Sequence, residues 1–368
     1  DAFEEEALFA TVTNVNFDAA RVAALVRTGA GLRDRARGLY EEACARAGRK
    51  PEPLGGPAAW TPAADDAGLA RQAAAIGILQ RRAARGDDLA GLEYLCLYGL
   101  KGMAAYMDHA LVLGRSDEEV LAFFHEALDF LTGEHDAAAL TAMALRIGEV
   151  NLKVMGILDA AHTGTFGHPV PTPVRITPVP GKAILVSGHD LHDLNALLEQ
   201  TAGTGIQVYT HGEMLPAHGY PGLKKHPHLA GNYGSAWQNQ RTEFAAFPGA
   251  ILMTTNCIQK PEESYRDRIF TTGLVRFPWV RHVANGAFGP VIEAARRQRA
   301  RHRLHHVGGT QRARPQPPRP TALVGAQLHP LHHSHRHGPR GDRHPGPERQ
   351  LQARRAVGAR RPAHARER

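Results

Sequence analysis

Apolar residues recur at helical spacing, every three or four positions, through most of the first 163 residues. The segments that show this spacing are residues 18–27, 31–47, 65–84, 87–113, 116–131 and 136–163. They show neither sustained heptads nor a longer repeat, which excludes a coiled coil or a solenoid. The pattern predicts an N-terminal helical bundle over residues 1–163.

Several residues mark the expected ends of these helices. Ser116 and Glu119 form a capping-box pattern, in which each side chain accepts a hydrogen bond at the start of a helix. Asp136 is expected to cap the last helix, which should stop near Gly164. Two glycines at 29 and 31 are expected to break the helix between the segments 18–27 and 31–47, because glycine is a poor helix former.

The periodicity changes after residues 164–181, a linker with five prolines and two glycines besides Gly164. Short apolar runs at 182–187, 206–210 and 250–255 are typical of buried parallel strands, and residues 267–277 can supply one more. An amphipathic helix lies between the first two runs, which indicates a βαβ unit. Residues 182–295 therefore predict a Rossmann-like parallel-sheet domain, and the fold class is α + α/β.

Three of these strands are followed by side chains that can bind a transition metal: His189, Glu213 and Cys257. In an open parallel sheet, ligands bind in the crevice outside the carboxyl ends of the strands, so the three donors should converge. A thiolate favours iron–sulfur chemistry or zinc, whereas a carboxylate favours a harder, oxygen-bound iron. We interpret them as part of the ligand set of a mixed iron site, with all three side chains facing one cleft.

Other interpretations of single residues stay open at this point. His192, His211 and His218 lie in the same segments, and periodicity does not distinguish them from His189. A glutamate after a strand is often a helix cap, and a cysteine is often an inert buried thiol. The remaining two cysteines lie on apolar helix faces and are expected in the core: Cys44 and Cys96.

Residues 296–368 differ in composition from the rest of the chain. They contain 18 Arg, no Lys and three acidic residues, a net charge of +15, whereas the whole chain carries +8. They also lack Ile, Met, Phe, Tyr and Trp, so this basic tail is expected to be disordered. A frameshift after about residue 295 is the favoured explanation. The alternatives are a nucleic-acid-binding arm, unlikely without aromatic residues for stacking, and a His-rich metal tract at 329–337.

Three cysteines in 368 residues are too few for a disulfide scaffold, which favours a reducing, cytoplasmic location. No run of about 18 apolar residues and no signal segment occurs, so no membrane association is expected.

Four strings around the candidate ligands resemble the hybrid cluster protein family, also called hydroxylamine reductase. They are VSGHDLHDL at 186–194, YTHGEMLPAHGYPGLKK at 209–225, GNYGSAWQ at 231–238 and TTNCIQKPEESYRDRIFTTG at 254–273. The similarity extends back through GEVNLKVMGILDAAHTGTFGHP at 148–169 and YGLKGMAAYMDHALVLG at 98–114 and covers about residues 90–282. These strings are long and specific to the family.

The resemblance implies that His189, Glu213 and Cys257 bind a hybrid iron–sulfur–oxygen cluster of the 4Fe-2S-2O type. It also selects His189 over its neighbours. It implies two-electron reduction of hydroxylamine to ammonia and water, with nitric oxide as a second proposed substrate. A redox electron donor would be the partner, and His218 and Glu243 are candidates for proton supply.

The sequence also departs from that family. The family completes the hybrid cluster with three further Cys, a Glu and a Lys from a second α/β domain, and no cysteine follows Cys257 here. The four Cys that bind the family's second iron–sulfur cluster are also absent, so we expect an incomplete chain, truncated at its N-terminus. The alternatives are a non-catalytic, metal-binding remnant and a carbon monoxide dehydrogenase-like enzyme, against which Glu213 argues.

Overall fold

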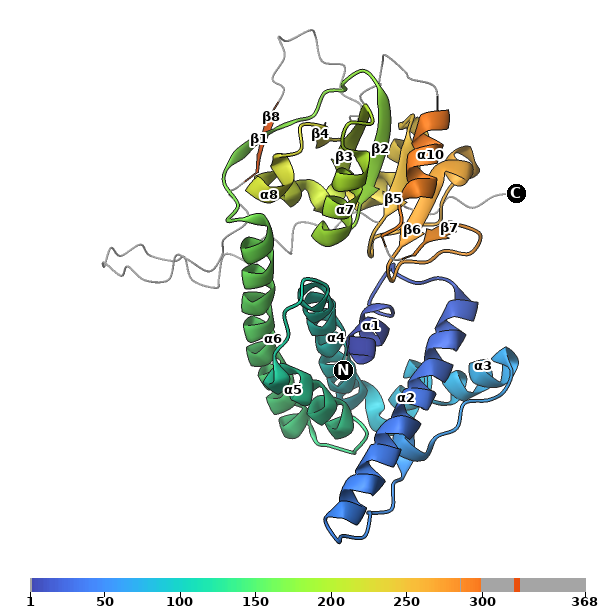
Figure 1. Cartoon of the computed structure of the whole chain (residues 1–368). Coiled ribbons are helices and arrows are strands. Elements are labelled where there is room, and N and C mark those ends of the chain that lie inside the picture. The colour runs from blue at the N-terminus through green and yellow to red at the C-terminus, as the bar shows by residue number, and fades with distance from the viewer. Residues whose placement is uncertain (1, 285, 299–320, 325–368) are drawn as a thin grey trace, which may run out of the picture. The chain divides into compact units, whose positions relative to one another are not determined.

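The computed structural model describes residues 2–284, 286–298 and 321–324 (Figure 1). Helices fill the first part of the chain, as the periodicity predicts. They are α1 (Ala2–Phe9), α2 (Ala19–Arg46), η1 (Gly56–Ala59), α3 (Asp66–Ala75), α4 (Ile78–Val112), α5 (Glu118–Phe130) and α6 (Ala137–Phe166). Among the residues described, no helix is long and apolar enough to cross a membrane.

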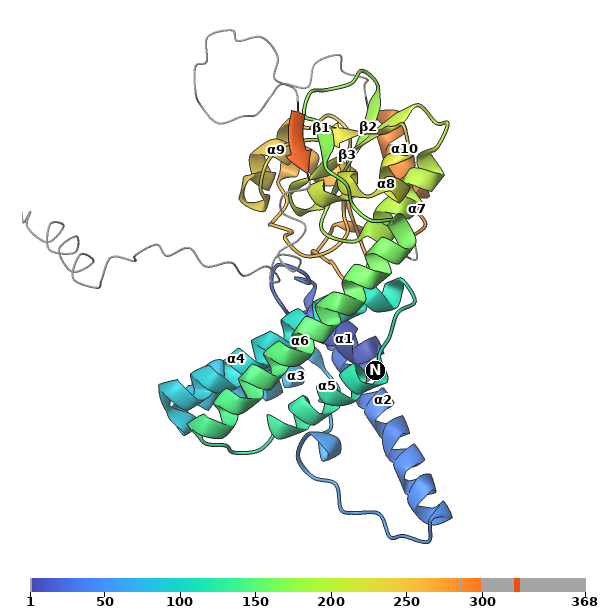
Figure 2. The same ribbon diagram turned by 90° about the vertical axis from the view of Figure 1, so that its left-hand side faces the viewer.

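The helical core forms where α4, α5 and α6 meet, and α4 and α6 lie side by side (Figure 2). Phe124 of α5 is fully buried among Leu100, Met103 and Met107 of α4. Cys96 belongs to the same core and Cys44 of α2 is also buried, so both cysteines occupy the interior as expected. All three cysteines of the chain are free.

Several predicted helix boundaries were wrong. The side chain of Asp117, not Ser116, caps α5 by accepting a hydrogen bond from the Val120 N–H at 3.0 Å. Helix α2 continues through both glycines at 29 and 31. A Cβ on Gly29 would lie 3.1 Å from the ring of Phe3 in α1, so this glycine allows close helix packing rather than a break. Tertiary contact therefore outweighs the low helix propensity.

The expected cap of α6 is confirmed, because the Asp136 carboxylate accepts a hydrogen bond from the Ala139 N–H at 2.8 Å. Asp136→Ala should lower the free energy of unfolding by about 1 kcal/mol, because the Ala139 N–H in the first turn of α6 loses its hydrogen-bond acceptor. Asp159→Ala, an exposed substitution in the interior of the same helix, is the control and should change stability by less than about 0.5 kcal/mol. Equal losses for the two variants in urea unfolding would contradict a capping role.

A six-stranded, fully parallel sheet follows, with the order β4-β3-β2-β5-β6-β7. Its strands are β2 (Lys182–Ser187), β3 (Ile206–His211), β4 (Leu229–Asn232), β5 (Ala250–Met253), β6 (Ile269–Thr272) and β7 (Arg281–Val283). The predicted parallel βαβ unit is confirmed: α7 (Leu191–Thr201), capped by Asp190, connects β2 to β3.

Residues on alternate sides of each strand enter two separate cores. Ile184 and Val186 of β2 pack with apolar residues of α7 and of α10 (Gly289–Arg297). Leu185 of the same strand faces the opposite way and packs with Phe244 of α9 (Gln240–Ala246). The sheet is therefore covered on both faces, which is why its strands are almost continuously apolar.

Two strands of the sheet, β4 and β7, escaped prediction because they are only four and three residues long and do not lie in a continuous apolar run. β4 contains Gly231, where a Cβ would lie 2.2 Å from the carbonyl oxygen of Arg175. That contact comes from β1 (Thr172–Arg175), a strand inside the expected linker, while α6 runs to Phe166, past the expected stop.

Most of the basic tail lies outside the described residues, so its predicted disorder stays a prediction. Four of its residues form β8 (Thr321–Val324), which pairs antiparallel with β1. This pairing differs from the disorder expected for the tail.

Candidate metal centre

His189 follows the carboxyl end of β2 and is half-buried. Its Nδ1 lies 2.9 Å from Thr255 Oγ1, and the same hydroxyl accepts a hydrogen bond from the His189 backbone N–H at 2.8 Å. Burial and the neighbouring charge of His109 lower the pKa of His189 to about 4. The imidazole is therefore neutral at neutral pH, and Thr255 and Asn256 both hydrogen-bond to it and orient the ring.

Gly188 allows this approach of the β2 and β5 strand ends. It has φ of +117°, and a Cβ there would lie 2.4 Å from Thr254 Oγ1 and 2.7 Å from the Thr255 N. Any larger residue would push His189 away from the threonines that orient it.

Glu213 is exposed and stands in the first turn of η2 (Gly212–Gly219), directly after β3. Both ends of η2 are anchored to the sheet by buried imidazoles. His211 precedes it, and His218 near its end lies 2.9 Å from Thr210 Oγ1 through Nε2. Burial lowers the pKa of His218 to about 4, so this residue is neutral at neutral pH.

Cys257 lies four residues beyond β5 and has φ of +72°, a conformation that non-glycine residues rarely adopt. The peptide that follows it is held on both sides. Its carbonyl accepts a hydrogen bond from Gln240 Nε2, and the Ile258 N–H donates to the Asn14 carbonyl at 3.1 Å. The strained backbone is thus maintained by contacts from distant parts of the chain.

Two observations connect the three strand ends. Burial and, second, the negative charge of Glu213 raise the pKa of Cys257 to about 11, so carboxylate and thiol are electrostatic neighbours. Thr255 joins His189 to the loop that carries Cys257. In the described part of the chain, however, no group of three or more His, Cys, Asp or Glu side chains is arranged to hold a metal ion. The convergence on one cleft stays a prediction.

The three rival histidines have other environments. His192 is exposed on α7. His211 is fully buried, with Nδ1 at 3.1 Å from Ser187 Oγ and Nε2 at 2.8 Å from Glu243 Oε2. His218 is bound to Thr210, as described above. The nitrogens of His211 and one nitrogen of His218 are therefore engaged by protein groups.

Two acids, half-buried Asp108 and buried Asp193, were missed by sequence reasoning. Burial, with the charge of Asp190 next in effect, raises the pKa of Asp108 to about 7. The same two causes raise the pKa of Asp193 to about 7, against a hydrogen bond from Thr272. Groups with a pKa near neutrality can exchange protons with a reacting group. Only their burial among distant elements, invisible in the sequence, distinguishes them from surface acids.

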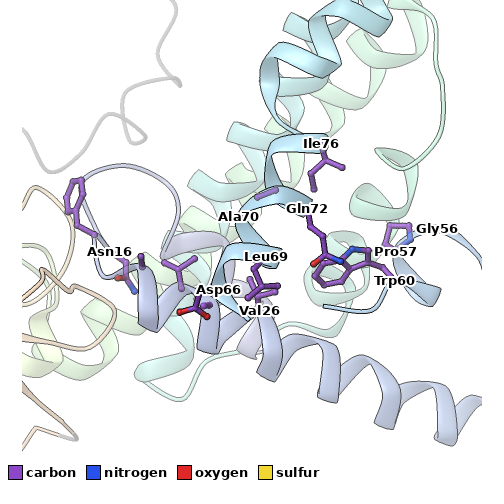
Figure 3. A pocket seen from close by; sticks show the side chains of 15 residues that line it. Asn16, Val26, Gly56, Pro57, Trp60, Asp66, Leu69, Ala70, Gln72 and Ile76 are labelled. Atoms are coloured by element: carbon purple, nitrogen blue, oxygen red, sulfur yellow. The ribbon is translucent and has the colours of Figure 1, made fainter. Parts of the chain in front are cut away.

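An apolar hollow of about 1100 Å³ lies between α2, η1 and α3 (Figure 3). Val26, Trp60, Leu69 and Ile76 contribute to its lining. No His or Cys lines it, so it lacks the donors that iron sites use.

Alkylation of Cys257 provides a test of its environment. With a pKa of about 11, the thiol is almost fully protonated at pH 8, and iodoacetamide should react slowly. Glu213→Gln removes one cause of the raised pKa, so the pKa should fall and the rate at pH 8 should rise. Peptide mass spectrometry reports each cysteine separately, with Cys96 as internal control. An unchanged pH profile in Glu213→Gln would show that the two side chains are not neighbours.

The fold and the strand-end donors define a helical plus parallel α/β protein with nitrogen, oxygen and sulfur donors along one edge of its sheet. The sequence matches the Prismane/CO dehydrogenase family over residues 1–311. The chain belongs to this family.

Curated relatives are similar over most of this chain. The hydroxylamine reductase of Rhodospirillum rubrum is 57% identical over 296 residues, which cover 80% of this chain and 54% of the relative. The hydroxylamine reductase of Acidiphilium cryptum is 56% identical over 297 residues, covering 80% and 53%. The hydroxylamine reductase of Solidesulfovibrio magneticus is 55% identical over 291 residues, covering 79% and 52%. The chain spans about half the length of the curated relatives it matches.

Proposed function

We propose that this chain contributes His189, Glu213 and Cys257 to a hybrid iron–sulfur–oxygen cluster of the 4Fe-2S-2O type. The cluster would serve an enzyme that reduces hydroxylamine to ammonia and water, with nitric oxide as a second substrate. Membership of the family implies iron–sulfur cofactors. The observation that carries the proposal is that the three residues follow the carboxyl ends of the adjacent parallel strands β2, β3 and β5. Burial and the charge of Glu213 raise the pKa of Cys257, and a bound cation would favour the ionised thiol.

The three residues have the right ligand chemistry for the hybrid cluster, but three ligands are fewer than the cluster requires. A neutral imidazole oriented by Thr255, a carboxylate and a thiol are suitable ligands for a mixed iron centre. The remaining ligands would come from polypeptide beyond the described residues, as would those of the second cluster. When bound, the cluster would supply electrons and Lewis-acid activation of the N–O bond.

The residues of this chain would position the cluster and supply protons for the reaction. Reduction of one hydroxylamine to ammonia and water consumes two electrons and two protons. The electrons come from a redox donor, and the protons from acids such as the carboxyls of Asp108 and Asp193. The substrate is a small molecule, no nucleic-acid partner is proposed, and three free cysteines agree with a cytoplasmic location.

Anaerobic reconstitution of the whole chain with ferrous iron and sulfide tests the ligand assignment. His189→Ala, Glu213→Ala and Cys257→Ser should each lower the iron retained after gel filtration and change the visible spectrum, because each removes a donor. His192→Ala, an exposed neighbour on α7, should retain as much iron as the parent chain. Equal iron in all five proteins would refute the assignment.

A non-catalytic metal-binding module is the second candidate, favoured by the lack of a complete ligand group among the described residues. Iron retention without hydroxylamine turnover, in the presence of a chemical reductant, would support it. A carbon monoxide dehydrogenase-like activity is a third alternative. The presence of Glu213 argues against it, as does the name hydroxylamine reductase carried by the relatives.

A further inference from the structure

One short helix, α9, contacts the loops that carry two of the three candidate ligands. Gln240 and Glu243 stand three residues apart, on neighbouring positions of one helical face, and both are almost fully buried. Thr242 between them is exposed. The two buried polar side chains point to different loops, and each is hydrogen-bonded there.

Glu243 is bound to the end of β3. Its Oε2 lies 2.8 Å from His211 Nε2, and its Oε1 accepts a hydrogen bond from Ser235 Oγ at 2.7 Å. His211 Nδ1 reaches Ser187 Oγ, its partner in the β2–β3 register, at 3.1 Å. Ser187, His211 and Glu243 thus form a continuous buried chain of hydrogen bonds.

That chain ends two residues from each of two candidate ligands. Ser187 precedes His189 by two positions, and His211 precedes Glu213 by two positions, at the point where η2 begins. Gly234 makes room for the pair, because a Cβ there would lie 2.6 Å from Glu243 Oε2 and 2.9 Å from His211 Cδ2. A buried carboxylate is costly without partners, so this arrangement is tightly specified.

Gln240 is bound to the other loop. Its Nε2 donates to the Cys257 carbonyl, and its Oε1 accepts a hydrogen bond from the Gln259 N–H at 3.3 Å. The amide therefore spans the left-handed turn at Cys257, which has φ of +72°. A residue in this conformation persists only where surrounding contacts hold it.

We propose that Gln240 and Glu243 are positioning residues, which set the Cys257 thiol and the Glu213 carboxylate at a fixed separation through one turn of α9. The inference rests on the proposed function for the identity of the ligands. The new element is that α9, which supplies no ligand, sets the positions from which the Cys257 thiol and the Glu213 carboxylate would bind the metal. It also gives Glu243 a structural contact with His211 in place of the proton-supply role considered from the sequence.

Two variants separate the two contacts. Gln240→Met keeps the size of the side chain and removes both hydrogen bonds. Glu243→Gln keeps the shape and one acceptor but loses the second acceptor and the negative charge. Thr242→Ala is the matched control on the exposed face of the same helix. Gln240→Asn, a neutral amide on a shorter side chain that reaches neither partner in the same way, and Ser235→Ala, which removes one donor to Glu243, are milder second variants if either first variant fails to fold.

The first readout needs no metal. In the whole chain, Gln240→Met should raise the iodoacetamide rate of Cys257 about fivefold at fixed pH, the change that one net hydrogen bond produces. Thr242→Ala should leave that rate unchanged. The second readout is the visible and paramagnetic spectrum per iron after reconstitution, which Glu243→Gln should alter because the Glu213 carboxylate moves. Thermal melting identifies variants that lose the fold.

The outcomes distinguish the two proposals. Unchanged Cys257 reactivity in Gln240→Met, together with an unchanged spectrum in Glu243→Gln, would overturn the positioning role while leaving iron binding intact. A parent chain that retains no iron would refute the proposed function, and the positioning role would then stand or fall on the alkylation rates alone. The positioning role would also be overturned if Thr242→Ala changed the Cys257 alkylation rate or the spectrum as much as the buried variants do.

Discussion

Gly249→Ala should lower the free energy of unfolding by about 3 kcal/mol, near the upper end of the usual cost of overpacking. A Cβ at this position would lie 2.0 Å from the carbonyl oxygen of Ala183 and 2.7 Å from a ring carbon of Phe247. The backbone cannot withdraw, because the β2–β5 pairing begins at the next residue, Ala250. The Gly249 carbonyl also accepts a hydrogen bond from buried Arg268 at 2.8 Å.

This substitution should affect the proposed metal centre as well as stability. The β2–β5 pair sets the relative heights of the strand ends that precede His189 and Cys257. We therefore expect Gly249→Ala to lower iron retention under conditions in which the chain is still folded. Urea unfolding and iron analysis on the same samples provide the measurement.

The matched control is Gly102→Ala in α4, where nothing lies within 4 Å of the added Cβ. Alanine there should stabilise the helix by about 0.5–1 kcal/mol, because glycine loses more backbone entropy on folding. Similar destabilisation by both substitutions would mean that the steric contact at Gly249 is not the cause.

Phe124→Ala should lower the free energy of unfolding by about 3–5 kcal/mol, the usual cost of emptying a buried aromatic site. The ring is completely buried, and Val120 and Ala127 of its own helix and Met103 of α4 lie in the same core cluster. Helices α4 and α6 cannot close the cavity without losing their contact with α5. Circular dichroism during denaturation should show the loss.

Leu145→Ala is the control for this substitution, since Leu145 of α6 is 67% exposed. It removes a large apolar side chain without leaving a cavity, so stability should change by less than about 0.5 kcal/mol. If Phe124→Ala cost no more than Leu145→Ala, the helical core would not be formed as described.

The strand-end prediction succeeded in its backbone part for a local reason. Each of the runs at 182–187, 206–210 and 250–255 is apolar on both faces, and a helical pattern connects the first two. Few folds are compatible with strands that are apolar on both faces and joined by a helix. The structure adopts one of them, a parallel sheet in which β3, β2 and β5 are adjacent. β4 ends in Gly231 and Asn232 and β7 has only three residues, so neither lies in a continuous apolar run and both were missed.

The sequence by itself determined the helical and strand periods, the residue that caps α6, and the kinds of side chain that follow β2, β3 and β5. These properties depend on neighbours within a few positions along the chain.

Only the tertiary structure decided which side chains pack against or hydrogen-bond to residues that are distant in the sequence. Phe3 makes Gly29 a packing site within α2, and Ser187 and Glu243 bind the nitrogens of His211. Gln240 reaches Cys257 from 17 residues away. Such contacts join residues far apart in the chain, and burial sets both their strength and the pKa values around them, so no local pattern carries them.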